Sequence, residues 1–237
     1  MASGIYVAAV GAVAQSNALD VTANNVANAS TTGFHGVRVS FHEALAKARS
    51  PDAVMVGGQS VGVDGRAGAM TQTGNPLDLA LDGDGYFAVN SPQGVRYTRA
   101  GALRLDAAGT LVNTDGLAVR GAGGAPIIIP PTATQVTIAQ DGTISSEAGP
   151  IGKLELARFP ARSMRRDGDT LYTATAAPLA GDPPRVLQGT LEGSNVNVVR
   201  GVVDLVTVSR TYESLLRVIE GFQTIENRAA RDLGGPK

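Results

Sequence analysis

The chain has 237 residues, a formal net charge of −1 and no cysteine. This balance gives no electrostatic reason to expect nucleic acid or an anionic membrane as a partner, and it excludes disulfides and thiolate metal sites. Aromatic residues are few (5 Tyr, 5 Phe, no Trp) whereas glycine reaches 30, which favours turn-rich β structure or packed fibres over a large-cored enzyme.

The first 32 residues predict an amphipathic helix whose apolar face is thin and rich in alanine. This face consists of Ile5, Ala9, Ala12, Leu19 and Val26, and a separate row carries Asn17, Asn24 and Asn28. So little apolar area cannot by itself offset the ordering of the backbone, and the helix therefore needs a partner. We expect Gly33 to end the helix in a left-handed conformation. The asparagine row is either solvated surface or a source of hydrogen bonds to neighbouring helices.

The same stretch partly imitates a secretory signal peptide. Ala12-Val13-Ala14 matches a small-x-small cleavage pattern, but no Lys or Arg precedes Arg38, so the positive n-region is missing. The apolar run is also too short to span a bilayer. We expect neither cleavage nor direct membrane insertion.

Two irregular stretches follow. A short helix is predicted after Phe34, because Ser40 and Glu43 have capping-box spacing and Pro51 follows its expected end near Arg49. Residues 56–75 are rich in glycine and predict a linker or an extended arm.

From Pro76 the apolar period changes to two, which indicates β-strands. The expected strands lie near 77–81, 86–89, 95–99, 102–105, 110–113, 117–119, 127–129, 135–138, 151–159, 171–175 and 186–191. Asp-Gly occurs six times, beginning at Asp64, Asp82, Asp84, Asp115, Asp141 and Asp167. Asp-Gly between short strands is a strong hairpin signal, so this part predicts a compact antiparallel β domain.

Residues 194–231 predict a second, longer helix of about 35 residues and about 50 Å. Its apolar stripe repeats every seven residues and is broadened on both sides. The repeat consists of Val198, Leu205, Tyr212 and Ile219, and the flanking positions are Val202, Val208, Leu215, Leu216 and Phe222. We interpret this helix as one made for association, and a long core helix is the alternative.

The predicted fold class is therefore α+β, with the N- and C-terminal helices pairing as an α-helical coiled-coil domain. Residues 1–75 and 186–237 would form this discontinuous domain, with 56–75 as its arm. Residues 76–185 would form a central antiparallel all-β domain.

No convincing catalytic, cofactor or metal site emerges. Asp82-Gly83-Asp84-Gly85 begins like a calcium loop, but Phe87 and Gln93 occupy the positions of the required Gly and Glu, so we read a hairpin turn. We expect His35 and His42 to be surface residues. Arg162, Arg165 and Arg166 predict a solvated turn, or else a subunit contact. We expect no small-molecule substrate and no enzyme activity.

Three blocks of the sequence carry a family resemblance. The run from Ala23 to Phe34 (ANNVANASTTGF) closely resembles the N-terminal signature of bacterial flagellar rod and hook proteins. Residues 77–89, followed by 97–101, look like the opening of that family's β domain, and residues 189–197 look like the segment leading into its C-terminal helix. The blocks stand in the family's order and cover essentially the whole chain.

The resemblance implies a non-enzymatic axial protein of the flagellum, exported uncleaved through the flagellar type III apparatus. The terminal helices would line the inner layer of a helical tube in the periplasmic rod, with the β domain outside. The partners would be copies of the chain, homologous rod subunits and the export apparatus. The expected subunit interface comprises Ile5, Ala12, Leu19, Asn24, Asn25, Val26, Asn28, Thr31, Gly33, Phe34, Ser194, Asn195, Asn197, Val198, Val202, Leu205, Tyr212, Leu216 and Ile219.

Within the family, the chain is too short to resemble a hook protein. The chain resembles the proximal-rod type more than the distal-rod type in its length, in the sequence of Ala29–Phe34 and in the modest segment between Phe34 and Asn75. His35 stands where the family usually has a basic residue. Two rival classes are a secreted β-rich binding module oligomerised by its helices, which should expose an aromatic platform, and an enzyme using Asp82 and Asp84.

Overall fold

The computed structural model describes residues 2–41, 59–133, 135–160 and 163–233. It divides into two compact units. Residues 1–27, 37–61 and 197–237 make up the first, which we call the helical unit, and residues 28–36 and 62–196 make up the second, the β unit. Helices at both ends of the chain and a multi-sheet β part confirm the α+β class.

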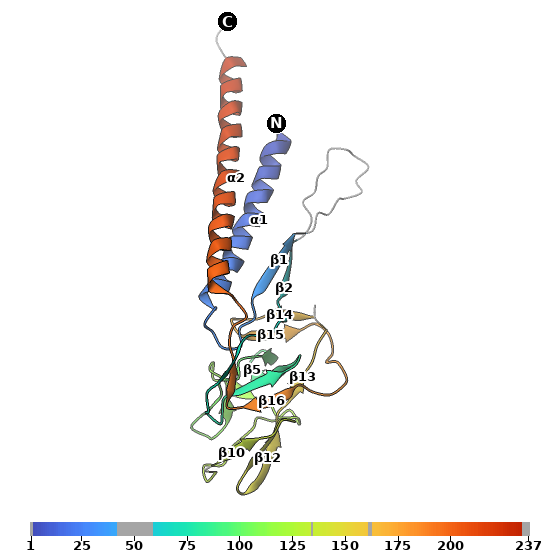
Figure 1. Ribbon diagram of the computed structural model, residues 1–237. Helices are drawn as coiled ribbons and strands as arrows, with labels where there is room; N and C mark the ends of the chain where they lie inside the picture. The colour runs from blue at the N-terminus through green and yellow to red at the C-terminus, as the bar shows by residue number, and fades with distance from the viewer. Residues whose placement is uncertain (1, 42–58, 134, 161–162, 234–237) are drawn as a thin grey trace. The chain divides into compact units, whose positions relative to one another are not determined.

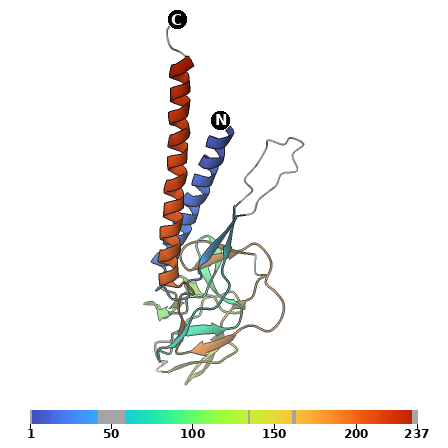
Figure 2. The same cartoon turned by 45° about the horizontal axis from the view of Figure 1, so that its top comes forward.

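The helical unit is built on two helices that lie side by side (Figures 1 and 2). Helix α1 spans Ala2–Ala27 and α2 spans Val198–Leu233. They are antiparallel, because Gly4 lies against Phe222, Gly11 against Leu215, and Gly201 against Val26. A Cβ atom at Gly4 would lie 2.9 Å from Phe222 Cζ, and one at Gly201 would lie 2.6 Å from Val26 Cγ2. Glycine therefore sets how closely the two helices approach.

The ends of the helices are fixed by asparagines. At the start of α2, Asn197 Oδ1 accepts a hydrogen bond from the Arg200 N–H at 3.0 Å, as an N-cap does. Near the end of α1, Asn25 Oδ1 accepts from the Val37 N–H at 2.9 Å and its Nδ2 donates to the Val37 carbonyl at 2.8 Å. Asn25 thus ties α1 to strand β1 (Val37–Phe41) within the helical unit. Strand β1 pairs with β2 (Gln59–Val63).

Two local predictions are wrong in this region. Ser40 lies inside β1 and not at the start of a helix; the rest of that predicted helix lies outside the described residues. Gly33 is left-handed (φ 67°) as expected, but α1 already ends at Ala27, so Gly33 does not cap it. Its conformation serves a contact instead: a Cβ there would lie 2.3 Å from the backbone nitrogen of Ala100.

Among the described residues, the β unit contains four sheets, all of them antiparallel. Its large sheet has the order β14-β15-β6-β5-β9-β8-β7, with β13 also on β5. Its strands are β5 (Tyr86–Ser91), β6 (Gly94–Thr98), β7 (Arg104–Leu105), β8 (Leu111–Val112), β9 (Ala118–Val119), β13 (Leu156–Ala157), β14 (Met164–Arg166) and β15 (Leu171–Ala174). Strand β4 (Leu79–Asp82) lies outside this sheet. A smaller sheet joins β10 (Val136–Ile138), β11 (Thr143–Ser146) and β12 (Gly149–Lys153). Two further pairs are β16 (Arg185–Gln188) with β4 and β17 (Thr190–Glu192) with β3 (Met70–Gln72).

One apolar core fills the β unit. Its members come from nearly every strand: Leu79, Leu81, Phe87, Val89, Leu103, Leu111, Val119, Ile127, Ile129, Ile138, Ile144, Leu154 and Val186. Aliphatic side chains dominate this set, and a single aromatic ring, that of Phe87, joins them. Burial of this set is the main favourable contribution to folding of the unit.

The strand pairs explain why the β unit extends beyond residues 76–185. Strand β16 pairs with β4 from Arg185↔Asp82 to Gln188↔Leu79, and β17 pairs with β3. Residues 62–75 and 186–196, which the sequence assigned to the helical part, therefore belong to the β unit, and part of the expected arm is strand. Residues 127–129 form no strand, and Ile128 makes one isolated bridge to Thr110. Strands β11 and β14 were not expected.

Candidate assembly surfaces

The seam between α1 and α2 uses one stripe of each helix. On α2 the half-buried positions include Leu205, Val208, Tyr212, Leu215, Ile219 and Phe222, all of which were predicted on the stripe, together with Gly201. Val198, Val202 and Leu216 were placed on the same stripe but are exposed. They lie roughly a quarter turn around the helix from Ile219, outside the reach of a single partner helix.

On α1 the seam is centred on small residues. Ala8, Ala12 and Ala18 are the buried positions of this helix, and Gly4 and Gly11 face α2 side chains. The predicted residues Ile5, Leu19 and Val26 are only half-buried. Small residues on α1 oppose large ones on α2, so the helices come close while little apolar area is removed from water.

Each helix also carries large apolar side chains that are exposed. On α1 these are Tyr6, Val7 and Val13, and on α2 they include Val199, Val203 and Val206 as well as the three misplaced stripe residues. Exposed apolar patches of this kind mark surfaces that contact another protein. Among the described residues, neither helix is apolar enough over sufficient length to cross a membrane.

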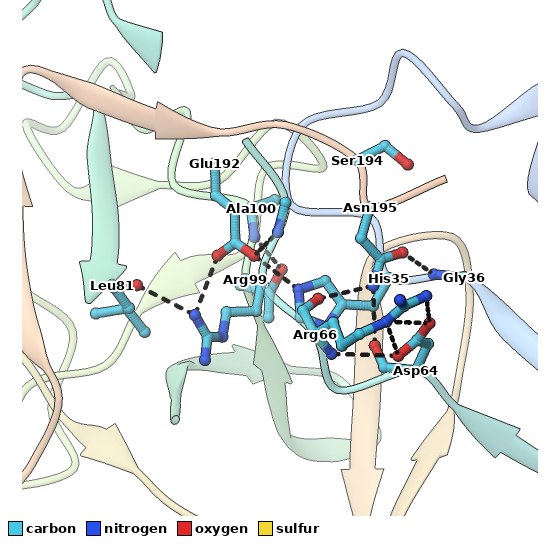
Figure 3. Close-up of polar contacts among 12 residues, drawn as sticks. His35, Gly36, Asp64, Arg66, Leu81, Arg99, Ala100, Glu192, Ser194 and Asn195 are labelled. Carbon is cyan, nitrogen blue, oxygen red and sulfur yellow. Dashed lines mark hydrogen bonds and ion pairs between the residues drawn. The ribbon is translucent and has the colours of Figure 1, made fainter. Parts of the chain in front are cut away.

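The centre of the β unit holds a buried charge cluster (Figure 3). His35 Nε2 lies 2.8 Å from Glu192 Oε1, and Arg99 Nη1 lies 3.0 Å from Glu192 Oε2. The Gly68 N–H donates to Glu192 Oε1 at 3.0 Å, and Arg99 also donates to the Leu81 carbonyl at 3.2 Å. All three charged or titratable side chains are buried, Glu192 completely.

This environment lowers the pKa of Glu192. Burial alone would raise the pKa, but the hydrogen bond from His35, the charge of Arg99 and the Gly68 N–H together favour the carboxylate more strongly. Glu192 is therefore ionised inside the β unit. A buried carboxylate that is fully paired holds its neighbours in place, and removal of any partner would leave a charge uncompensated.

The segment 28–36 is held onto the β unit at several further points. The Gly33 N–H donates to the Glu192 carbonyl at 2.7 Å, and Phe34 is fully buried. The Arg166 guanidinium lies 4.1 Å from the Phe34 ring centroid, and its Nη2 donates to the His35 carbonyl at 2.5 Å. This is a cation–π contact combined with a charged hydrogen bond.

Asn195 completes the attachment (Figure 3). Its Oδ1 accepts from the Gly36 N–H at 2.8 Å, and its Nδ2 donates to the carbonyls of Asp64 at 3.0 Å and Arg66 at 2.7 Å. Its own N–H donates to the Phe34 carbonyl at 3.2 Å. One asparagine thus joins three segments that are far apart in sequence.

Several residues expected at a subunit interface are therefore engaged within this chain. The Thr31 hydroxyl donates a hydrogen bond to Asn28 Oδ1, and Phe34 is buried within the β unit next to the buried Gly33. Ser194 Oγ accepts from the Val196 N–H. Asn195 bonds the Gly36 N–H, and Asn197 caps α2. Asn24 remains on the exposed side of α1 and Asn25 on the β1 side.

Two predictions about charged residues are wrong. His35 is not a surface residue, because its side chain is 1% exposed. The sequence did not reveal this because its partner, Glu192, lies 157 positions away and no local pattern connects the two residues. Arg166 is not in a solvated turn but in β14, packed on Phe34. Arg165 is exposed, and Arg162 and His42 lie outside the described residues.

The sequence did contain one usable signal for this cluster. Arg99 and Glu192 each lie inside one of the three motif blocks, among small and apolar residues. A charge in such a setting is either exposed or paired, and two opposite charges in two separate blocks are candidates to pair with one another.

Comparison with known proteins matches all three parts of this architecture. Family profiles described as flagella basal body rod protein, flagellar hook protein FlgE/F/G D1 domain, and flagellar basal body rod FlgEFG protein C-terminal match residues 5–35, 80–146 and 187–231. The flagellar basal-body rod protein FlgF of Escherichia coli is 36% identical over 97% of both chains. That of Caulobacter vibrioides is 35% identical over 91% of both, and the rod protein FlgG of Bacillus subtilis is 33% identical over 85% of this chain and 88% of its own.

The chain belongs to the flagellar basal-body rod protein family. It is a structural subunit and not an enzyme, and the location of this family is the flagellar basal body. As a rod-family protein it assembles with homologous subunits. The first profile ends at His35 and the third begins at Leu187, so the buried pair of His35 and Glu192 joins the N-terminal family segment to the C-terminal one.

Proposed function

We propose that this rod-family subunit polymerises into the axial tube that transmits torque from motor to hook, and that it occupies the proximal part of the rod. The observation that carries the first part is the helical unit. Its helices bury little area against each other and expose apolar side chains on their outer faces. Such surfaces need partners, and repetition of a modest contact in every subunit makes a stiff tube.

In this proposal α1 and α2 form a coiled coil in the inner layer of the tube. The heptad spacing of Leu205, Tyr212 and Ile219 and their half-burial against α1 support that geometry. The remaining exposed positions, among them Val198, Val202 and Leu216, would contact neighbouring subunits, as would Asn24. We further propose that the chain passes through the flagellar type III apparatus without cleavage and lies in the periplasmic part of the rod. The missing positive n-region supports the absence of cleavage.

Two substitutions on α2 test assembly. Leu205→Asp would bury an unpaired charge in the seam, at a cost of several kcal/mol, and should abolish rod formation. Leu216→Asp alters an exposed position and should leave the purified monomer folded but prevent assembly. Thr207→Asp, on an exposed position of the same helix, is the control. Swimming motility and electron microscopy of basal bodies are the readouts, and wild-type motility of Leu216→Asp would contradict the proposal.

The proximal position is supported by the modest segment between Phe34 and Asn75. Its test is a strain that lacks the distal-rod subunit. Basal bodies purified from that strain should still contain this chain, detected by immunoblotting. Its absence there, with normal incorporation in the parent strain, would assign it to the distal rod.

A further inference from the structure

Strand β3 is an edge strand of the β unit. Among the described residues it pairs with β17 and with no other strand, so the two form a sheet by themselves. All of Met70–Gln72 is exposed, as are Ala69 and residues 73–76. The side of β3 that faces away from β17 is therefore open to solvent.

The backbone hydrogen bonds show which groups of β3 face outward. The Ala69 carbonyl and the Thr73 N–H are each bonded to the backbone beside β17, at 2.8 Å. In an antiparallel pair, residues bonded to the neighbouring strand alternate with residues whose N–H and C=O point the other way. Met70 and Gln72 occupy these alternate positions. Each therefore presents a backbone donor and a backbone acceptor outward, and neither residue has a partner for them in the described part of the chain.

The two edges of the large sheet are protected, unlike β3. At one edge β14 contains Arg165 and Arg166, and at the other β7 is two residues long and contains Arg104. Charged side chains and short length are two means by which proteins prevent an edge strand from pairing with another chain. Both edges are therefore unsuited to accept a further strand.

The three-stranded sheet is closed by other groups of the same chain. At β10, Gln188 Oε1 accepts from the Ile138 N–H at 3.1 Å, and Gln188 Nε2 donates to the Val136 carbonyl at 2.8 Å. One side-chain amide thus occupies the place of a neighbouring strand. At the opposite edge, formed by β12, the Lys153 carbonyl accepts from the Ala122 N–H at 2.8 Å.

The pair of β4 and β16 is bordered on both sides as well. The Leu79 N–H donates to the Gly101 carbonyl and the Val186 N–H donates to the Gln140 carbonyl, both at 2.9 Å. Strand β17 accepts the Gly33 N–H on the side away from β3. Among the described edges of the four sheets of the β unit, β3 alone is neither charged nor occupied.

The composition of this edge suits recognition through the backbone. No charged residue lies between Arg66 and Asp78, and the side chain of Met70 is 40% exposed and flexible enough to fit different neighbours. Strand addition gains its affinity from main-chain hydrogen bonds and makes few demands on the partner's side chains. It therefore suits partners that share a fold but only about a third of their sequence, as the relatives of 33% and 36% identity do.

We propose that an extended segment of a neighbouring rod-family subunit adds to the outer edge of β3 as a further strand; the proposal rests on the polymerisation proposed above. Met70 and Gln72 exchange backbone hydrogen bonds with this segment, and the two-stranded sheet becomes three-stranded. Two paired strands alone are only marginally stable in water, and a third strand strengthens them. The contact lies on the β unit and is separate from the exposed side chains of α1 and α2.

Proline substitutions separate the outward backbone groups from the inward ones. Gln72→Pro removes an outward N–H, and proline is accepted at such edge positions. The purified variant should therefore give the circular dichroism spectrum of the natural chain, while immunoblots of basal bodies show a several-fold lower content. Thr71→Pro removes an N–H that faces β17 and should lower the unfolding midpoint of the purified chain.

The matched control is Gln72→Ala, which changes the side chain and keeps the N–H. It should enter basal bodies as the natural chain does. Normal incorporation of Gln72→Pro would overturn the proposal. Equal losses for Gln72→Pro and Gln72→Ala would also overturn it, because they would assign the contact to the side chain.

Cross-linking identifies the partner without the use of proline. The natural chain has no cysteine, so Gln72→Cys provides a single attachment point for a thiol-reactive benzophenone. Irradiation of basal bodies should join this position to a peptide of a neighbouring rod-family subunit, identified by mass spectrometry. The purified, unassembled variant should give no such product.

Three results would contradict strand addition at β3. They are a link only within the same chain, a link only to the same position of a second copy, and no link at all in rods that contain the variant. Absence of the natural chain from purified rods is a different result, because it refutes the proposed function itself.

Discussion

The β unit and the helical unit of this chain satisfy their buried groups in different ways. The β unit encloses an aliphatic core and pairs even its buried charges, with Glu192 bonded to His35 and Arg99. The helical unit brings two helices together over glycine and alanine and leaves valines exposed on both outer faces. The β unit buries its core within a single chain, whereas in the proposed assembly the helical unit is completed by neighbouring subunits. A polymer subunit can thus combine a domain with a buried core and helices whose exposed apolar side chains are available for contact with other subunits.

Hydrogen exchange on the purified, unassembled chain should show this contrast most strongly. We expect the amides of α1 and α2 to exchange at least 100-fold faster than those of the core strands β5 and β6, because opening the helical pair exposes little apolar area. Mass spectrometry of peptides from the two units provides the measurement. Equal protection of both units in a demonstrated monomer would remove the distinction.

Glu192→Ala should have the largest effect on the stability of the β unit. Arg99 would remain buried without its counter-charge, and breaking a buried pair costs about 3–5 kcal/mol. Denaturant unfolding followed on the β unit measures it. The control is Glu155→Ala, whose partner Arg120 is partly exposed, so the expected loss is up to about 1 kcal/mol.

The same carboxylate predicts a pH dependence. Its pKa is lowered in the folded state, so its contribution to stability is present above the ordinary glutamate value of 4.5 and is lost as the pH falls below that value. The Glu192→Gln variant should lose less stability than the natural chain over this acid range. Equal slopes of unfolding free energy against pH would show that Glu192 does not titrate as inferred.

A glycine pair on α2 tests the seam. Gly201→Ala places a Cβ 2.6 Å from Val26 Cγ2, and because a β-branched side chain cannot rotate away freely, we expect a loss of about 1–3 kcal/mol. Gly221→Ala meets no atom within 4 Å and should stabilise the helix by up to about 1 kcal/mol. Thermal melting of the helical circular dichroism signal measures both. A stabilising Gly201→Ala would mean that the helices are not in contact there.

The smallest effect is expected at the surface of the β unit. Asp141 has its pKa lowered to about 2 by hydrogen bonds from the Thr143 N–H and hydroxyl and from Lys153. Its contribution is therefore present above the ordinary value of 3.8 and is lost only as the pH falls toward 2. The carboxyl resonance of Asp141 should titrate near 2 in the folded chain and near 4 in urea. Asp141→Asn should change the unfolding midpoint at neutral pH less than any substitution above.

The sequence predicted those features that depend on local pattern. The heptad repeat and its flanking positions located α2 and most of its half-buried stripe. The alternation of Leu77, Leu79 and Leu81 located the first core strand. It failed where a partner lies far along the chain. No residue pattern near His35 predicts its contact with Glu192, and none near Gly33 predicts the close approach of the Ala100 backbone. The predicted apolar face of α1 is shifted by about one residue from the buried positions Ala8, Ala12 and Ala18. An alanine-rich helix shows little difference in hydrophobicity between its faces. Glycines that permit close packing can be recognised only when the facing helix is known.

The span between His35 and Glu192 sets the order of events during synthesis. His35 and Glu192 are separated by 157 positions and Arg99 and Glu192 by 93. Because a ribosome adds about 5–20 residues per second, His35 waits about 10–30 s for its carboxylate and Arg99 about 5–20 s. Strand β4, with which the core begins, likewise lacks its β16 neighbour until residue 185 has been made. Until then a closed β unit would bury Arg99 without a counter-charge. The buried charge cluster of the β unit can therefore close only after about four fifths of the chain has been synthesised.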